Sequence, residues 1–280
     1  MSQASPSLAV LMTIHNRREA SLACLQRLFA QSLDCQMRVI ILDDGSTDGS
    51  SEAIKAAFPA VQIIKGDGNY YWNRGMHRIF GEALSENHDF YLWLNDDTYL
   101  YPHALQMLLD AWQEVGPQAI IAGGTLDPKR ETFSYGGFVR RSRWTLKLEE
   151  VGPNHQIQAI TTMHGNCVLI PRAVAQVVGN IEPFYRHRWG DPDYGLRAQK
   201  LGCQVYLAPE FVGNCPSNPL AEAWTDPRRS FGERLADFHS IKGYGKEDWF
   251  FYVRRHGGLL WPLLWLKPYW DMLLNRNKHR

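Results

Sequence analysis

Hydrophobic residues in the first half of the chain fall into short unbroken runs that alternate with helix-like patterns. The runs lie at 8–14, 37–42, 61–65, 90–94 and 120–122. Runs of this length and composition predict strands that are buried on both faces of a parallel sheet. Helical patterns follow the first four runs and end near Phe29, Ala57, Glu86 and Val115. Strands that alternate with helices predict βαβ units and an α/β fold.

The middle of the chain has a different pattern of shorter strands. Gly136-Gly137 lies between β-type residues, so 132–148 predicts a hairpin, and a short helix is expected over 171–178. Further strands are expected at 159–163, 168–170 and 204–207. Asp191 followed by Pro192 predicts a helix start, with Asp at the N-cap and Pro at the first helical position.

Residues 226–280 lack the strand pattern and combine aromatic, apolar and basic residues. Helical spacing at 235–241 is followed by aromatic stretches at 249–256 and 259–274. Two prolines, a lysine and an aspartate interrupt the last stretch, so a simple membrane span is not expected. Trp, Tyr, Leu and Arg together suit a membrane surface, with the apolar face in the acyl chains. The alternatives are packing of this tail on the sheet domain or in a homodimer.

Charge and cysteine content narrow the class of protein. The chain of 280 residues has a net charge of +1, so no global field favours nucleic acid as a partner. The tail holds 11 Lys and Arg against 6 Asp and Glu, so an acidic body carries a basic tail. Five cysteines without C-x-x-C spacing predict reduced thiols in a cytosolic protein and no zinc site. The N-terminus does not have the basic region of a signal peptide.

Acidic side chains follow two of the predicted strands at the point where each strand ends. Asp43-Asp44 follows the second strand, and Asn95-Asp96-Asp97 follows the fourth. The ends of parallel strands meet at one edge of the sheet, where open α/β sheets bind ligands. Two carboxylates and an amide suit Mg²⁺, which takes one or two carboxylates plus substrate phosphates. An Asx-rich turn is the alternative for either motif alone.

Four motifs in order resemble those of the inverting glycosyltransferases of family 2. They are Thr13-Ile14-His15-Asn16-Arg17, Asp43-Asp44-Gly45-Ser46-Thr47-Asp48, Asn95-Asp96-Asp97 and Gly190-Asp191-Pro192-Asp193-Tyr194-Gly195-Leu196-Arg197. Together they cover roughly residues 7–210, and the loop at 71–76 resembles a branch that transfers rhamnose and related sugars. The resemblance implies the GT-A fold, a mainly parallel α/β sheet flanked by helices, with the tail as a C-terminal helical extension.

The resemblance also implies a division of the chain and an activity. Residues 1–225 would form the transferase domain, with a nucleotide-binding half up to about 125 and an acceptor half over 126–225. A sugar would move with inversion from a UDP- or dTDP-sugar to a hydroxyl of a glycan or lipid-linked acceptor, with Mg²⁺ or Mn²⁺ as cofactor. The expected setting is bacterial cell-surface polysaccharide synthesis, on the inner face of the cytoplasmic membrane.

The matching motifs and the residues around them give individual side chains a role. Asp191 would be the catalytic base, and Asp97 with Asn95 would hold the metal. The donor would be bound by Thr13, Arg17, Asp44, Trp72, Asn73 and Asp96, and the acceptor by His164, Trp189 and Asp193. The structural alternatives are a helix cap for Asp191, a loop cap for Asp44 and core packing for the tryptophans. Asp193 could also form an i,i+4 ion pair with Arg197.

Two residues depart from the family pattern. Asn95 stands where many members have Asp, and Gly190 stands where many have Glu. Both favour an alternative function, a non-catalytic sugar-nucleotide-binding or membrane scaffold protein. A sugar nucleotidyltransferase is a second alternative, but the loop 13–17 lacks the glycines that such enzymes use for a triphosphate. A Rossmann dehydrogenase is disfavoured because Gly66-Asp67-Gly68 lacks the third glycine and follows the wrong strand.

Overall fold

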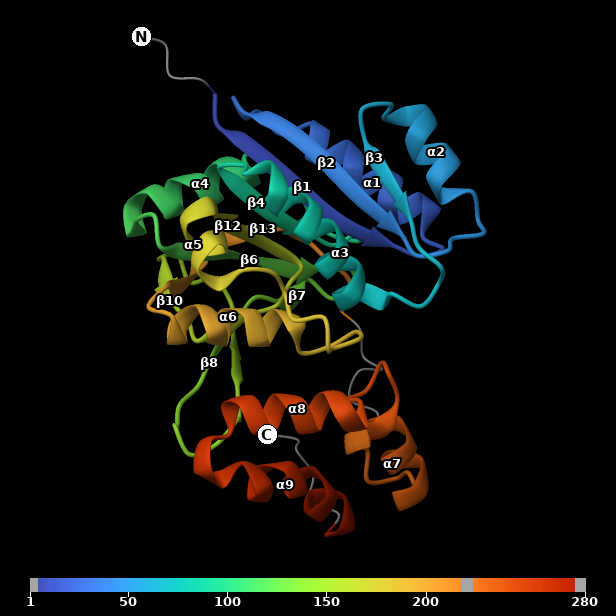
Figure 1. Cartoon of the computed structure of the whole chain (residues 1–280), viewed down its shortest axis with the longest axis vertical. Coiled ribbons are helices and arrows are strands. Elements are labelled where there is room, and N and C mark those ends of the chain that lie inside the picture. The colour runs from blue at the N-terminus through green and yellow to red at the C-terminus, as the bar shows by residue number, and fades with distance from the viewer. Residues whose placement is uncertain (1–4, 218–223, 275–280) are drawn as a thin grey trace.

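A large mixed sheet forms the centre of the molecule, with helices on both of its faces (Figure 1). The computed structural model describes residues 5–217 and 224–274, and within them the strand order is β10-β13-β6-β12-β4-β1-β2-β3. The long strands are β1 (Ser7–Ile14), β2 (Gln36–Asp43), β3 (Gln62–Lys65), β4 (Phe90–Leu94), β6 (Ala119–Asp127), β12 (Cys167–Pro171) and β13 (Gln204–Asn214). Strands β1 to β4 run parallel to one another, as does the pair of β6 and β13, while β12 is antiparallel to both neighbours. The mainly parallel α/β fold predicted from the sequence is confirmed.

Two helical layers cover the sheet, and side chains alternate between them along each strand. One layer holds α1 (Arg18–Phe29), α2 (Ser50–Ala57) and α4 (Ala104–Val115), and the other holds α3 (Tyr71–Glu86), α5 (Arg172–Val178) and α6 (Gly190–Lys200). In β4, Leu92 packs in the core of the first layer and Trp93 in the core of the second. Burial on both faces explains why the sequence of β4 is an unbroken apolar run.

Short strands build the region that the sequence predicted as one hairpin. β7 (Thr132–Tyr135) pairs with β6, whereas β8 (Gly137–Val139) pairs with β9 (Glu149–Val151) and β11 (Thr162–Met163) in a small second sheet. β5 (Tyr99–Leu100) and β10 (Gln158–Ala159) pair with β13. The prediction of a single hairpin over 132–148 was therefore wrong, because Gly136 separates two strands that belong to different sheets.

The tail folds into three helices that pack beneath α6. They are α7 (Phe231–His239), α8 (Lys246–His256) and α9 (Trp261–Leu273), with a 3₁₀ turn at Gly258–Leu260 between the last two. Ser230 and Glu233 form a reciprocal capping box at the start of α7. α8 lies between α6 and α9 (Figure 1). Among the described residues, no helix is long and apolar enough to cross a membrane.

Candidate active site

The Asn95-Asp96-Asp97 motif begins directly after β4 and brings two carboxylates together. Arg17, at the start of α1, donates from Nη1 to Asp96 Oδ1 at 3.2 Å and to Asp97 Oδ2 at 2.5 Å. Burial and the neighbouring charge of Asp97 raise the pKa of Asp96 to about 7. Two crowded carboxylates that resist joint ionisation favour a cation between or beside them. Arg17 supplies part of that positive charge in the structure.

Asn95 lies beside this pair but is engaged elsewhere. Its Oδ1 accepts a hydrogen bond from the indole Nε1 of Trp72 at 2.8 Å, and its backbone N–H donates to the Asn166 carbonyl. The ring of Trp72 also packs edge-to-face on Trp93. The metal role predicted for Asn95 stays a prediction, and the contact that its amide oxygen makes in the structure is to Trp72.

Asp191 lies in the first turn of α6 and is linked to Trp72 through Gly165. Its Oδ2 accepts a hydrogen bond from the Gly165 N–H at 2.8 Å. Gly165 in turn lies flat against Trp72, since a Cβ built there would be 2.6 Å from the Cζ2 and Cη2 atoms of that ring. Burial raises the pKa of Asp191, although the charges of His164 and Arg188 oppose the rise. The predicted N-cap of α6 was two positions late, because Trp189 is the cap residue and Asp191 makes no cap hydrogen bond.

The side chains of three residues predicted to touch substrate contact other parts of the protein. Asn73 is fully buried and donates to the carbonyls of Glu182 and Tyr185. Asp193 is also fully buried among cationic side chains of α6 and α8, and Trp189 packs in the aromatic cluster of the tail. The donor role of Asn73 and the acceptor roles of Asp193 and Trp189 stay predictions, and the contacts of these side chains in the structure are to their own chain.

Asp44 and Thr13 line the loop that follows β3. The Asp44 carboxylate accepts backbone N–H groups from Gly68, Tyr70 and Tyr71, which orders the Gly-rich loop before α3. This is the loop-cap role that the sequence left open, and the contact to a nucleotide stays a prediction. The methyl group of Thr13 packs on Gly75 of α3, where an added Cβ would lie 2.7 Å from Thr13 Cγ2.

His164 sits next to Gly165 at the edge of the small sheet. Its Nε2 lies 3.1 Å from Glu150 Oε1, and its ring packs against Tyr135 and Phe138. The charge of His164 acts on Asp191, while the polar contact of the His164 side chain is to Glu150. The acceptor role predicted for His164 stays a prediction.

Several cationic side chains act on His187, which lies four residues before Asp191. Burial, together with the charges of Arg188, Lys242 and Arg17, lowers the pKa of His187 to about 4. The same Arg188 acts on Asp191. Lys242 lies in the tail, between α7 and α8, so the tail contributes one of these cations. A diphosphate is the kind of anion that such a group of cations favours.

The carboxylates of Asp96 and Asp97 fit a divalent ion whose other coordination positions are filled by water and a bound ligand. In the described part of the chain, no three His, Cys, Asp or Glu side chains are grouped as a self-sufficient metal site. Mg²⁺ commonly takes only one or two protein carboxylates and fills its shell with water and phosphate oxygens. Asp97 and Asp96 provide such a donor set, and the raised pKa of Asp96 reports the electrostatic cost that a cation would relieve.

Several site residues had no individual signal in the sequence. Gly165 supplies the N–H that holds Asp191, and Asn166 binds both Asn95 through its carbonyl and Cys215 through its amide. Cys215 Sγ in turn lies 3.4 Å from Asp97 Oδ1. The strands predicted on either side of residues 164–166 indicated a connecting loop there. The sequence did not predict the contacts of its backbone, because they are made to motifs that lie far away in the sequence.

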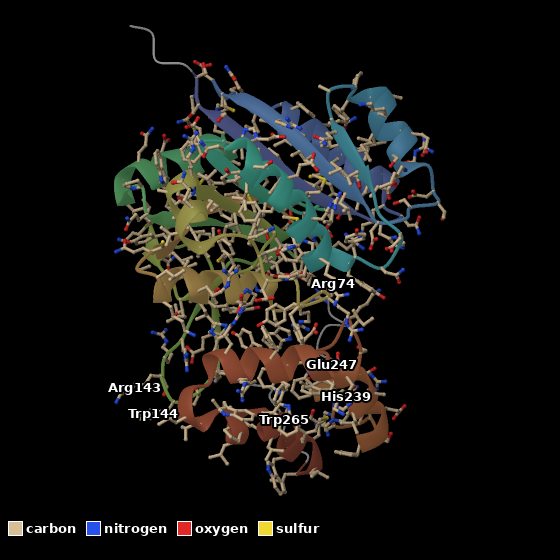
Figure 2. The ribbon with its side chains drawn as sticks, in the orientation of Figure 1. Arg74, Arg143, Trp144, His239, Glu247 and Trp265 are labelled. Atoms are coloured by element: carbon tan, nitrogen blue, oxygen red, sulfur yellow. The ribbon has the colours of Figure 1, made fainter. Side chains whose placement is uncertain are left out.

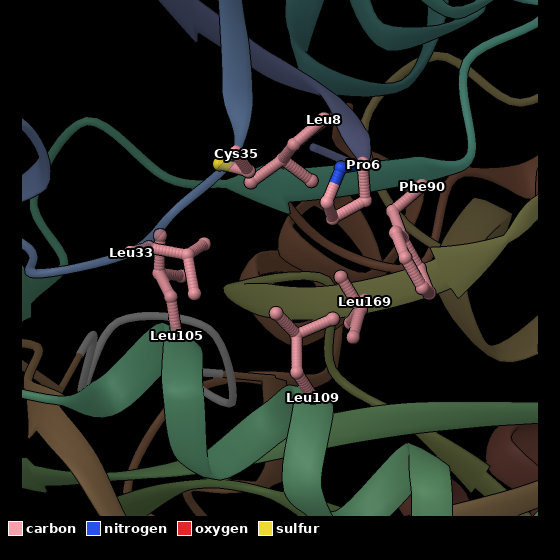
Figure 3. Close-up of a pocket in the computed structure, with 8 residues that line it drawn as sticks. All are labelled: Pro6, Leu8, Leu33, Cys35, Phe90, Leu105, Leu109 and Leu169. Carbon is pink, nitrogen blue, oxygen red and sulfur yellow. The ribbon is translucent and has the colours of Figure 1, made fainter. Parts of the chain in front are cut away.

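A small closed cavity lies away from these residues. It has a volume of about 10 Å³ and only apolar lining apart from one thiol (Figure 3). Its lining includes Leu8 of β1 and Phe90 of β4, near the amino ends of the strands. The polar residues of the candidate site follow the carboxyl ends of the same strands, so the cavity is a feature of core packing.

A family model described as Glycosyl transferase family 2 matches residues 9–179. The chain belongs to glycosyl transferase family 2. This family 2 glycosyltransferase is 24% identical to the N-acetylglucosaminyl-diphospho-decaprenol L-rhamnosyltransferase of Mycobacterium tuberculosis, over 95% of this chain and 89% of that protein. The motifs that suggested the family in the sequence lie around one site in the structure.

Solved structures agree with the GT-A fold of this glycosyltransferase. A mannosyltransferase from Pyrobaculum calidifontis, in complex with GDP-Man and Mn²⁺, is similar with a TM-score of 0.59 at 13% identity, over 97% of this chain and 73% of that chain. GalNAc-T7 with UDP, GalNAc and Mn²⁺ is similar with a TM-score of 0.59 at 12% identity, over 97% of this chain and 55% of that chain. At such low identity the likeness concerns the fold.

Proposed function

We propose that this glycosyltransferase moves a sugar with inversion from a nucleotide-diphosphate donor to a hydroxyl of a lipid-linked acceptor. One observation carries the proposal, a continuous series of contacts from the carboxylate pair to Asp191. Asn95 binds Trp72, Trp72 packs on Gly165, and the Gly165 N–H binds Asp191. The two groups that such a reaction needs, a diphosphate site and a base, are thus linked through one edge of the Trp72 indole, from Nε1 on the Asn95 side to Cζ2 and Cη2 on the Gly165 side.

Asp191 acts as the general base in this proposal. The acceptor hydroxyl gives its proton to the Asp191 carboxylate while its oxygen bonds to the anomeric carbon of the donor sugar. The bond from that carbon to the diphosphate breaks, and the nucleoside diphosphate leaves from the opposite face, so the configuration inverts. Burial raises the pKa of Asp191, which makes its carboxylate a stronger base than an exposed one.

Asp97 and Asp96 hold Mg²⁺ or Mn²⁺ in this proposal, and Arg17 faces the donor phosphates. A bound divalent ion would supply positive charge against the negative charge of the leaving diphosphate. Arg17 already contacts both carboxylates, so it lies where the ion and the diphosphate would meet. The Mn²⁺ in both similar structures supports a divalent metal.

The name of the curated relative guides the choice of substrates. That protein acts on an N-acetylglucosaminyl-diphospho lipid and transfers L-rhamnose. We therefore propose a UDP- or dTDP-sugar as donor and a polyprenyl-diphosphate-linked sugar as acceptor, in bacterial cell-surface polysaccharide synthesis on the cytoplasmic side of the membrane. The cations around His187 suit a substrate that carries a diphosphate.

The tail is proposed to bind the membrane surface that carries such an acceptor. Large apolar side chains are exposed along one side of α9 and the turn before it: Leu259 (99% exposed), Leu263 (67%), Leu266 (38%), Trp270 (57%) and Leu273 (59%). The sequence after α9, 275–280, carries three Lys and Arg residues and no acid. Figure 2 shows Arg143 and exposed Trp144 on the loop between β8 and β9, on the side where α8 and α9 lie. Apolar side chains flanked by cations suit an anionic bilayer surface.

A transfer assay tests the proposed reaction. Wild type is incubated with UDP-, dTDP- and GDP-sugars and an N-acetylglucosaminyl-diphospho-prenol, with Mg²⁺, Mn²⁺ or chelator. We expect transfer from one class of donor, loss of transfer with chelator, and a decrease of about 10²–10⁴-fold in Asp191→Asn. Asp110→Asn, at an exposed position of α4, is the matched control and is expected to behave as wild type.

The same assay separates the alternatives. Donor binding without transfer to any acceptor would favour a non-catalytic binding protein. Formation of a sugar nucleotide from a nucleoside triphosphate and a sugar phosphate would favour a nucleotidyltransferase. Full activity in Asp191→Asn would contradict the assignment of the base.

A further inference from the structure

The first turn of α6, which carries Asp191, is held by side chains of the C-terminal tail. Asp193 lies two residues after Asp191 and is fully buried. Its carboxylate accepts from Arg197 Nε at 2.8 Å on its own helix, from Arg255 Nη1 at 3.1 Å, and from His256 Nε2 at 2.8 Å. Two of these three cationic or polar donors come from the end of α8.

The tautomer of the His256 imidazole follows from its contact with Lys200. Lys200, near the end of α6, donates from Nζ to His256 Nδ1 at 3.2 Å and to the Arg255 carbonyl at 3.0 Å. Because a lysine ammonium has no acceptor, His256 Nδ1 must accept and Nε2 carries the proton toward Asp193. α6 is therefore tied to α8 near both of its ends.

The residues just before Asp191 are bound by the tail as well. Trp189 is the N-cap of α6 with a φ of +75°, a backbone region that bulky residues rarely adopt. Its indole N–H donates to the Tyr244 carbonyl at 2.9 Å, and its ring centroid lies 4.4 Å from that of Tyr252. Such a conformation persists only where surrounding contacts determine it, and here those contacts come from the tail.

The loop that leads into α6 has the same kind of support. Asp248 of α8 accepts from the Arg186 backbone N–H at 3.1 Å, and Arg255 Nη2 donates to Glu182 Oε2 at 2.8 Å. The Asp191 carboxylate accepts a hydrogen bond from the Gly165 N–H and makes no cap contact. The position of its carboxylate therefore depends on the turn that carries it.

We propose that Arg255 and His256 are positioning residues for Asp191, because they bind Asp193 and Glu182 and so hold the turn that carries the base. The inference rests on the proposed role of Asp191. The tail is accordingly a part of the acceptor side of the active site as well as a surface helix. Displacement of a reacting group by about 1 Å costs on the order of 100-fold in rate.

Point variants of the full chain test this inference. Arg255→Met and His256→Leu remove the contacts to Asp193, and Arg255→Lys keeps the charge but loses the two-pronged contact. Arg254→Met is the matched control, since Arg254 is exposed and lies over the ring of Trp261. The readouts are kcat in the transfer assay, donor affinity by calorimetry, and the pKa of Asp191 from the carboxyl ¹³C signal that Asp191→Asn removes.

We expect kcat to fall about 10- to 100-fold in Arg255→Met and His256→Leu while donor affinity stays within about twofold. The Asp191 pKa should fall toward ~3.9 in both variants, because a loosened turn exposes its carboxylate to water. Arg255→Lys should lie between wild type and Arg255→Met, and Arg254→Met should match wild type.

Other outcomes overturn the inference. Wild-type kcat and an unchanged Asp191 pKa in folded Arg255→Met and His256→Leu would show that the tail does not position the base. A loss of donor affinity as large as the loss of kcat would show a general structural role. If either apolar variant does not fold, Arg255→Lys decides through the same two readouts. If wild type transfers no sugar, the proposed function fails, and the ¹³C titration still tests the inference by itself.

Discussion

At the scale of residues, two carboxylates in one helical turn have opposite properties. Burial raises the pKa of Asp191, which has one backbone donor. Burial also opposes ionisation of Asp193, but the hydrogen bond from His256 and the charge of Arg197 outweigh it and lower the pKa to about 2. Groups whose environments push their pKa values apart commonly have different tasks. Here the first suits proton transfer and the second suits permanent ion pairing.

The acid limb of the pH–rate profile is expected to report Asp191. A base works only when it is ionised, so kcat should fall as the pH drops through the pKa of Asp191. Because burial raises that pKa, the midpoint should lie above ~3.9, the ordinary value for Asp. The positive charge of His164 lowers the pKa of Asp191, so His164→Gln should move the limb to higher pH. A limb at or below the ordinary value, or one that His164→Gln leaves in place, would contradict the prediction.

The buried ion pair of Asp193 is expected to show in acid stability. Asp193→Asn leaves Arg255 and Arg197 with an uncompensated charge and should lower the free energy of unfolding at pH 7 by about 3–5 kcal/mol. The folded pKa is below the unfolded value, so this contribution is present above ~3.9 and is lost as the pH falls toward about 2. Urea unfolding of wild type and variant at several pH values measures it. Asp226→Asn, which breaks an exposed pair, should change little, and an equal cost for Asp193→Asn at all pH values would oppose this account.

At the scale of elements, packing explains why position 190 holds Gly where many family members have Glu. α3 and α6 meet at Asn73 and Gly190, where an added Cβ would lie 1.5 Å from Asn73 Oδ1. Asn73 cannot move freely, because its amide holds two carbonyls of the loop before α6. A longer side chain at 190 is therefore incompatible with Asn73 in its present position, so the two residues have to be considered together.

Gly190→Ala should therefore destabilise the fold by about 1–3 kcal/mol, as overpacking of a core does. In an Asn73→Ala background the same substitution should cost at least about 0.5 kcal/mol less, because the obstructing atom is absent. Gly232→Ala, at a position of α7 with open space, is the control and should be neutral or stabilising. Equal costs for Gly190→Ala in both backgrounds would show that the two sites are independent.

The elements that the sequence predicted well are those with a strong local pattern. β4 was predicted over residues 90–94 and has those bounds, because burial on both faces leaves an unbroken apolar run. The segment 132–148 was misassigned because pairing partners of short strands are decided by distant chain segments. The same limit applies in the site: Asp191 and Asp97 follow from motifs, whereas the Gly165 N–H and the Trp72–Asn95 contact depend on tertiary packing.

At the scale of the whole molecule, the tail joins the catalytic side to a proposed membrane surface. α8 contacts α6 through Asp193, while the exposed apolar side chains belong to α9 and the turn before it. The aromatic cluster between them includes Tyr185 and Leu196 of the main domain together with Trp249 and Tyr252 of the tail. The division at residue 225 stays a prediction, and this shared core shows how closely the two parts are packed.

Membrane binding by α9 can be measured by sedimentation with vesicles. Wild type is expected to bind anionic vesicles more than zwitterionic ones, and Leu263→Asp with Trp270→Asp should reduce binding at least about tenfold. Leu201→Asp, at an equally exposed leucine on the far end of α6, should bind as wild type. Unchanged vesicle binding of the α9 variant would oppose the proposal. If wild type forms a concentration-dependent dimer and the α9 variant is monomeric, this face is a homodimer interface instead.

Calorimetric titration of the donor tests whether the Asp97 site binds a nucleotide-sugar through a divalent ion. Wild type and Asp97→Ala are titrated with UDP-, dTDP- and GDP-sugars in the presence of Mg²⁺, Mn²⁺ or chelator. The account predicts that one class of donor binds wild type only with a divalent ion and that Asp97→Ala loses this binding. Binding of no donor with either metal, or donor binding of equal strength in wild type and Asp97→Ala, would contradict the account.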